Sequence, residues 1–178
     1  MLMTKAEWAL LVFAAVLLNP VDGWAQTQWE RYVAQPTRAN AEAVRELTYS
    51  DSGRDPKRME YDLMLLEVQV VSSDSAAVDL AFRLRRTADG HVGELLDEAL
   101  GRLIRINPRL FLRSLQRQGG IAARPDSLVG NFGDAYVDRP VAQAYERDQR
   151  IAALLTVREP SLLQLRDTCV GLLRQIIK

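Results

Sequence analysis

The chain has 178 residues, which is enough for one domain with a self-sufficient hydrophobic core. Its 23 basic and 23 acidic side chains balance, so it lacks the basic excess expected of a protein that binds nucleic acid. A single cysteine, Cys169, excludes an internal disulfide, and the fold must therefore be held by its core.

The first 25 residues resemble a secretory signal peptide. Lys5 and the α-amino group supply positive charge, residues 8–18 are apolar without a break, and residues 23–25 place small side chains at the two positions that a signal peptidase reads. The apolar run is shorter than the roughly 20 residues that span a bilayer. We therefore expect export to the periplasm or the extracellular space, with no membrane span after cleavage; the alternative is an uncleaved anchor.

The next part of the chain predicts four amphipathic helices. The first covers 27–33, the second follows Pro36-Thr37, the third covers 57–71, and the fourth follows the capping residues Ser72 to Asp74. The end of the third, residues 66–71, also alternates with the period of a strand. Because no second alternating run is present to pair with it, a helix is the better prediction.

The pair of helices over 91–118 is expected to form the centre of the fold. Apolar residues at 92, 95, 96, 99, 100, 103 and 104 recur at steps of three and four, which is one face of a helix. Asn107-Pro108 ends that helix and starts another, since asparagine is a good N-cap and proline suits the first helical position. The next apolar stripe consists of Leu110, Phe111, Leu112 and Leu115.

Residues 119–139 are rich in glycine, proline, aspartate and asparagine, and we expect an irregular loop that is either mobile or functional. A helix starting at Pro140 follows, with Asp148 on its apolar face, where we expect it to bond an arginine. The last helix carries Cys169 on its apolar face. The residues predicted to face inward on the first of these two helices are Val141, Ala144, Tyr145, Ile151, Ala152 and Leu155.

The whole pattern predicts a single all-α domain over 26–178, with about seven helices linked mostly by short turns. A helical bundle and a short stack of antiparallel helical hairpins both satisfy it. The unit over 91–118, with Arg102 and a run of leucines, is loosely similar to the hairpins of HEAT-type repeats. Of the two arrangements, this resemblance implies the stack of antiparallel helical hairpins.

Only one group of residues suggests catalytic chemistry. His91, Glu94 and Glu98 share a helix face and could hold a divalent metal ion or act as a base and its partner. Acidic residues in a first helical turn also stabilise the helix dipole, which is the simpler explanation. No HExxH, paired CxxC or EF-hand motif is present, and Cys169 is expected to be a buried structural thiol. We therefore assign no catalytic, cofactor or metal residues.

Two groups of residues form the candidate interaction surface: Phe132, Asp134 and Tyr136 in the loop, and Arg109, Arg113 and Arg117, which are spaced four apart. Such a basic stripe could meet an acidic partner, or it could be a solvated outer face. The favoured function is an exported protein-binding or scaffold module whose partner is another protein. The alternatives are a metal- or carboxylate-dependent hydrolase built around His91 and nearby acids, and a purely structural envelope protein.

Export makes a prediction that a mass measurement can check. Protein purified from its native host should begin at Gln26, because the signal peptidase would cut after Ala25. An intact N-terminus at Met1 would contradict the predicted cleavage.

Overall fold

The computed structural model describes residues 26–50, 55–88, 90–123 and 125–176, and within these ranges the chain is helical and contains no strand. The predicted signal peptide lies outside the described residues. The all-α prediction is confirmed. The elements are α2 (Gln28–Ala34), α3 (Arg38–Ala43), α4 (Pro56–Val71), α5 (Ser75–Arg85), α6 (Gly90–Ile106), α7 (Pro108–Arg117), α8 (Pro125–Gly130), α9 (Pro140–Leu155), α10 (Leu163–Gln175), and the short 3-10 helices η2 (Gly120–Ala123), η3 (Asp134–Tyr136) and η4 (Pro160–Leu162).

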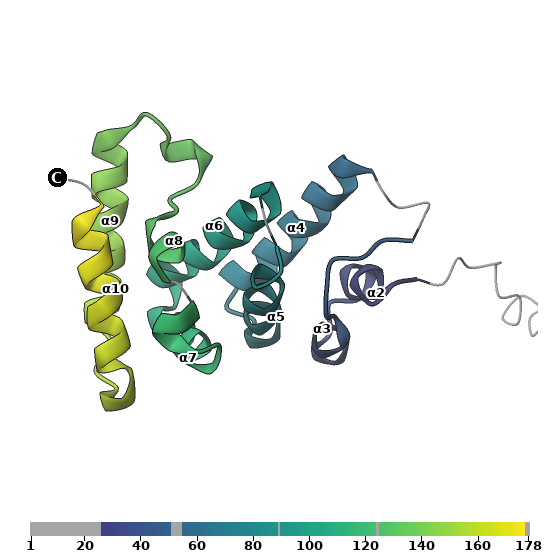
Figure 1. Ribbon diagram of the computed structural model, residues 1–178, viewed down its shortest axis with the longest axis horizontal. Helices are drawn as coiled ribbons and strands as arrows, with labels where there is room; N and C mark the ends of the chain where they lie inside the picture. Colours follow the sequence, from purple (N-terminus) through teal and green to yellow (C-terminus); the bar gives the residue numbers. More distant parts are fainter. Residues whose placement is uncertain (1–25, 51–54, 89, 124, 177–178) are drawn as a thin grey trace, which may run out of the picture.

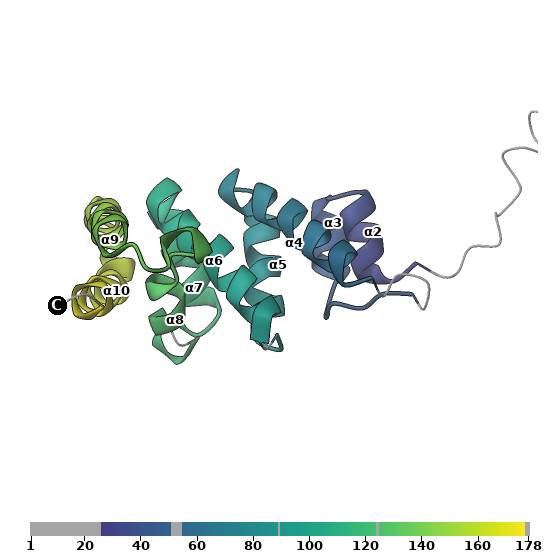
Figure 2. The same ribbon diagram turned by 90° about the horizontal axis from the view of Figure 1, so that it is seen from above.

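Successive pairs of helices lie side by side along the long axis of the molecule (Figure 1). Helix α4 pairs with α5, α6 with α7, and α9 with α10, so that α4 and α6 form the upper row of Figure 1 and α5 and α7 the lower row. Viewed from above, α2 and α3 lie at one end of the row and α9 and α10 at the other (Figure 2). The packing of these pairs therefore makes a short stack of helical hairpins.

Side-chain caps set where the central helices begin. The Asp74 carboxylate accepts a hydrogen bond from the backbone N–H of Ala77 at 2.8 Å, and the Asn107 side chain accepts one from Leu110 at 3.1 Å. Both caps satisfy amide groups that have no partner inside the helix. The short turn at Asn107 joins α6 to α7, as predicted.

Helix α6 supplies much of the core. Its buried apolar residues come from the face that the sequence predicts, and on α7 the three side chains of Phe111, Leu112 and Leu115 are fully buried. Burial of each large apolar side chain stabilises the fold by about 1.5–3 kcal/mol. The buried apolar positions of α6 are Leu96, Ala99, Leu100, Leu103 and Ile104.

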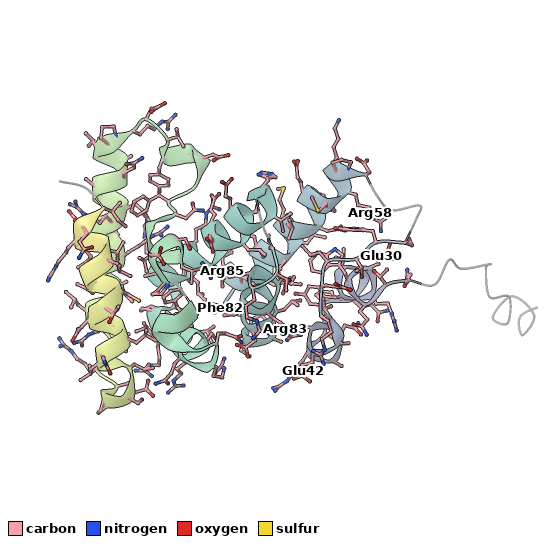
Figure 3. The ribbon with its side chains drawn as sticks, in the orientation of Figure 1. Glu30, Glu42, Arg58, Phe82, Arg83 and Arg85 are labelled. Atoms are coloured by element: carbon pink, nitrogen blue, oxygen red, sulfur yellow. The ribbon has the colours of Figure 1, made fainter. Side chains whose placement is uncertain are left out.

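Polar contacts attach the N-terminal helices to the stack. Arg83 on α5 donates to the carbonyl oxygens of Ala41 (3.1 Å) and Val44 (2.5 Å), at the end of α3 (Figure 3). The Ser50 hydroxyl donates to Glu30 on α2 at 2.8 Å. Because the carbonyl groups at a helix end have no intrahelical partner, Arg83 satisfies them and fixes α3 against α5.

Cys169 is buried on the inner face of α10, as predicted. Burial raises the pKa of its thiol to about 12. Because the thiolate is the reactive form, burial disfavours reaction at this cysteine, which packs in the core.

The prediction for the inner face of α9 is wrong except at Ile151, which is partly buried against the core. Val141 is 83% exposed and Tyr145 is 61% exposed, whereas the buried residues of this helix are Glu146, Arg150 and Leu154. Most of the predicted apolar positions lie away from the core because the buried ion pair of Glu146 and Arg150 occupies much of the inner side. Asp148 accordingly lies at the surface, where it pairs with Arg147 at 2.9 Å.

The segment 119–139 is more ordered than an irregular loop. It contains η2, α8 and η3, and α8 buries Leu128 and Val129 against its neighbours α6 and α10. Helix α8 has only six residues, which is too short for a repeating apolar pattern to identify.

Two glycines inside helices provide a test of how closely α6 packs on α8. A Cβ atom at Gly101 would lie 2.9 Å from the Leu128 carbonyl oxygen and 2.9 Å from Nη1 of Arg150, whereas one at Gly171 would meet nothing within 4 Å. Helix propensity alone favours alanine at both positions by about 0.5–1 kcal/mol.

We therefore expect Gly171→Ala to raise the free energy of unfolding by about 0.5–1 kcal/mol. Gly101→Ala should lower it by about 1–3 kcal/mol, because the added methyl group overpacks against backbone atoms. Urea unfolding measures both. If both substitutions change the free energy of unfolding in the same direction, the close approach of α6 and α8 is contradicted.

Candidate interaction face

The outward face of α6 carries the polar residues singled out in the sequence. His91, Glu94 and Glu98 lie three or four residues apart and are opposite the buried face of the helix. Glu94 and His91 are exposed, and Glu98 is half-buried. The sequence pattern therefore placed these three side chains correctly on one side of the helix.

An acidic cleft of about 330 Å³ lies between this face of α6 and the segment 130–137. His91, Glu94 and Glu98 line one side, and Asp134 and Tyr136 line the other. The fold thus brings the three α6 residues together with an acid from a segment 40 residues away in the chain, which no sequence pattern indicates.

The titratable side chains on the α6 side of this cleft are exposed or already paired. Among the described residues no three His, Cys, Asp or Glu side chains are placed to hold a metal ion. Nε2 of His91 lies 3.6 Å from Oε1 of Glu60, and both side chains are more than half exposed. Glu98 is bonded by Arg102 at 2.5 Å. A buried base with an oriented partner, which general acid–base catalysis uses, is not formed by these residues.

A second, apolar cleft of about 250 Å³ runs between α4 and α6. Leu63, Met64 and Leu95 provide its apolar surface, with Glu60 and Glu67 beside them. His91 and Leu95 also line the acidic cleft. The two clefts therefore form one continuous surface across α4, α6 and η3.

Helix α4 adds a row of exposed apolar side chains next to the apolar cleft. Tyr61 and Met64 are each 61% exposed, Val68 is 55% exposed and Leu65 is 37% exposed. Their spacing of three and four residues places them on one side of the helix, away from the buried Leu63, Leu66 and Val70. We define the α4–α6 face as these four residues together with eight of the residues that line the two clefts: Glu60, Leu63, Glu67, His91, Glu94, Leu95, Glu98 and Asp134.

The sequence itself carries a signal for this face. Residues 61–71 contain more apolar side chains than one buried face of α4 can take, and those at 61, 64, 65 and 68 follow helical spacing of their own. A contiguous exposed apolar patch on a globular protein commonly marks an interaction site.

Arg150 holds the segment that forms the far wall of the acidic cleft. Its Nη1 donates to the carbonyl oxygens of Val129 (3.0 Å) and Asn131 (2.9 Å), and its Nε donates to Glu146 at 3.2 Å. The guanidinium group also lies 4.7 Å from the centre of the Phe132 ring. Burial lowers the pKa of Arg150, and the bond to Glu146 opposes this shift.

Gly133 fixes the position of Asp134. Its φ of +87° is one that residues with a side chain rarely adopt, and a Cβ atom there would lie 2.1 Å from Oε1 of Glu98. The Asn131 side chain accepts a hydrogen bond from the Gly133 N–H at 2.9 Å. The positive φ therefore favours glycine at this position, and the missing side chain leaves room for the Glu98 carboxylate.

The six residues predicted as an interaction surface occupy two separate places. Phe132, Asp134 and Tyr136 all line the acidic cleft, although Phe132 is largely buried, with its ring 6.2 Å from that of Tyr136. The three arginines lie on α7, in the lower row of Figure 1, and each pairs with a carboxylate. Arg109 and Arg113 lie 3.8 and 2.6 Å from Glu159, and Arg117 lies 2.7 Å from Asp79.

No protein-family model, curated protein sequence or solved structure gives a significant match to this chain. In the described ranges no helix has the length and apolar character needed to cross a membrane.

The buried ion pair makes a stability prediction. Arg150→Met removes every bond to the 129–131 carbonyls and leaves Glu146 with Arg105 alone, at 3.0 Å. We expect a loss of about 3–5 kcal/mol in the free energy of unfolding, because breaking a buried pair leaves polar groups without partners. Faster amide exchange in residues 129–134 should accompany it.

Arg38→Met is the control for Arg150→Met. Arg38 pairs with Glu42 at 2.7 Å, four residues away, but its side chain is 80% exposed. An exposed pair of this kind contributes about 0.3–0.5 kcal/mol. Comparable losses in the two variants would show that Arg150 does not hold the segment.

Proposed function

We propose that this chain is an exported helical module that binds another protein through the α4–α6 face. The observation that carries the proposal is the row of Tyr61, Met64, Leu65 and Val68, whose large apolar side chains lie in solvent beside a cleft. Export to the periplasm or the extracellular space is part of the proposal and follows from the character of residues 1–25.

The composition of the face supports protein binding. Interfaces typically have an apolar centre and a polar rim, and a few large side chains supply most of the binding free energy. Here Leu63, Met64 and Leu95 provide the apolar part, and carboxylates lie beside it. Stacked helical hairpins also present extended surfaces suited to a macromolecular partner.

Site-specific cross-linking tests this function. A benzophenone amino acid replaces Tyr61, which is aromatic and exposed, so the substitution leaves the core intact. In an extract of the native host we expect a discrete adduct with one partner. The same adduct should be lost when Met64→Asp is added, because a carboxylate in the apolar row cannot be buried cheaply at an interface.

The control places the same amino acid at Gln164, an exposed position of α10 away from the α4–α6 face. No adduct is expected there. An adduct that forms equally from both positions, or one that survives Met64→Asp, would contradict binding at this face.

A further inference from the structure

The α4–α6 face is acidic although the chain as a whole is neutral. The described residues that line its two clefts include five carboxylates and no lysine or arginine, in a chain with 23 acidic and 23 basic residues. The fold has therefore concentrated negative charge beside the exposed apolar row of α4. The carboxylates are those of Glu60, Glu67, Glu94, Glu98 and Asp134.

The charges of this face are only partly compensated by the protein itself. Arg102 is shared between Glu67 and Glu98, at 2.5 Å from each. Among the described residues the carboxylates of Glu94 and Asp134 form no ion pair, and both side chains are exposed. Glu60 faces His91 at 3.6 Å, which is a charged partner only when the histidine is protonated. A net negative potential remains over the clefts.

The shape of the face also restricts its occupant. The apolar cleft lies between two packed helices, α4 and α6, with Leu63, Met64 and Leu95 on its surface. A groove of this kind takes an amphipathic helix, which buries residues at steps of three and four in it. The acids at its borders then lie within reach of the helix's flanking side chains.

We propose that the partner binds with a cationic amphipathic helix. The helix lays its apolar side on Leu63, Met64 and Leu95 and directs lysine or arginine toward Glu60, Glu94 and Asp134. This inference rests on the proposed function and adds the chemistry of the partner. The same carboxylates repel an anionic membrane surface, which is why a protein segment is the occupant that the charges favour.

Defined peptides test the inference on the purified full chain. Three fluorescent peptides of about 18 residues, or five helical turns, are compared: an amphipathic Leu/Lys helix, its Leu/Glu counterpart and a scrambled Leu/Lys sequence. By fluorescence anisotropy we expect the Leu/Lys helix to bind at least about tenfold more tightly than either of the others. Met64→Asp should remove this binding.

Two double variants, each lacking two exposed acids, test whether binding requires the carboxylates of this face. Glu94→Gln with Asp134→Asn removes the two exposed acids of the acidic cleft and should weaken Leu/Lys binding by about two- to tenfold, an effect that fades at high salt. Glu42→Gln with Glu46→Gln removes two exposed acids near α3 and should leave binding unchanged.

Several results would overturn the inference. If the Leu/Glu helix binds as tightly as the Leu/Lys helix, the face does not select positive charge, and if the scrambled peptide does so, the face does not select an amphipathic helix. If the two double variants lose the same amount of affinity for the Leu/Lys helix, binding depends only on the overall charge of the protein. Binding of the protein to phosphatidylglycerol vesicles in place of the peptide would assign the face to a membrane. The cross-linking experiment separates this inference from the proposed function. If the peptide tests fail but the adduct formed from position 61 is still lost on Met64→Asp, the face binds a protein and only the inferred chemistry of the partner is wrong.

Discussion

Helix α6 buries one side against its neighbours and keeps the other in solvent, and both the stability and the candidate site depend on this division. Leu96, Leu100 and Leu103 lie on the buried side, in contact with helices before and after α6 in the chain. Because a helix repeats every 3.6 residues, the same register that buries these leucines directs His91, Glu94 and Glu98 outward. The acidic cleft is thus a direct consequence of the way the core is packed.

The far wall of that cleft depends on a charge inside the protein. Arg150 can lie almost fully buried because two backbone carbonyls, a carboxylate and an aromatic ring surround its guanidinium group. Gly101 leaves the space that the arginine and the Leu128 carbonyl occupy. A buried ion pair adds little net stability compared with apolar packing, but it ties α8 and the turn that follows to one position. That position places Asp134 opposite Glu94.

The apolar residues of this chain serve two purposes. On α4 one set fills the core, and a second set, at Tyr61, Met64 and Val68, remains in water next to the acids of α6. Leaving three large apolar side chains in water costs free energy that burial would recover, and a binding partner supplies that burial. The α7 arginines, by contrast, already have carboxylate partners within the chain, so they have less to offer a ligand.

The amino-acid sequence alone determined the all-α fold, the register of α6 and α7, the caps at Asp74 and Asn107, and the burial of Cys169. These features depend on residues close together in the chain, which periodicity and capping rules describe. The inward face of α9 could not be predicted, because the groups that make a buried arginine tolerable come from Val129, Asn131 and Phe132, which meet it only in the folded state. For the same physical reason, only the tertiary structure decided that Asp134 joins the acids of α6 and that, in the part of the chain that the structure describes, the outer residues of α4 remain exposed.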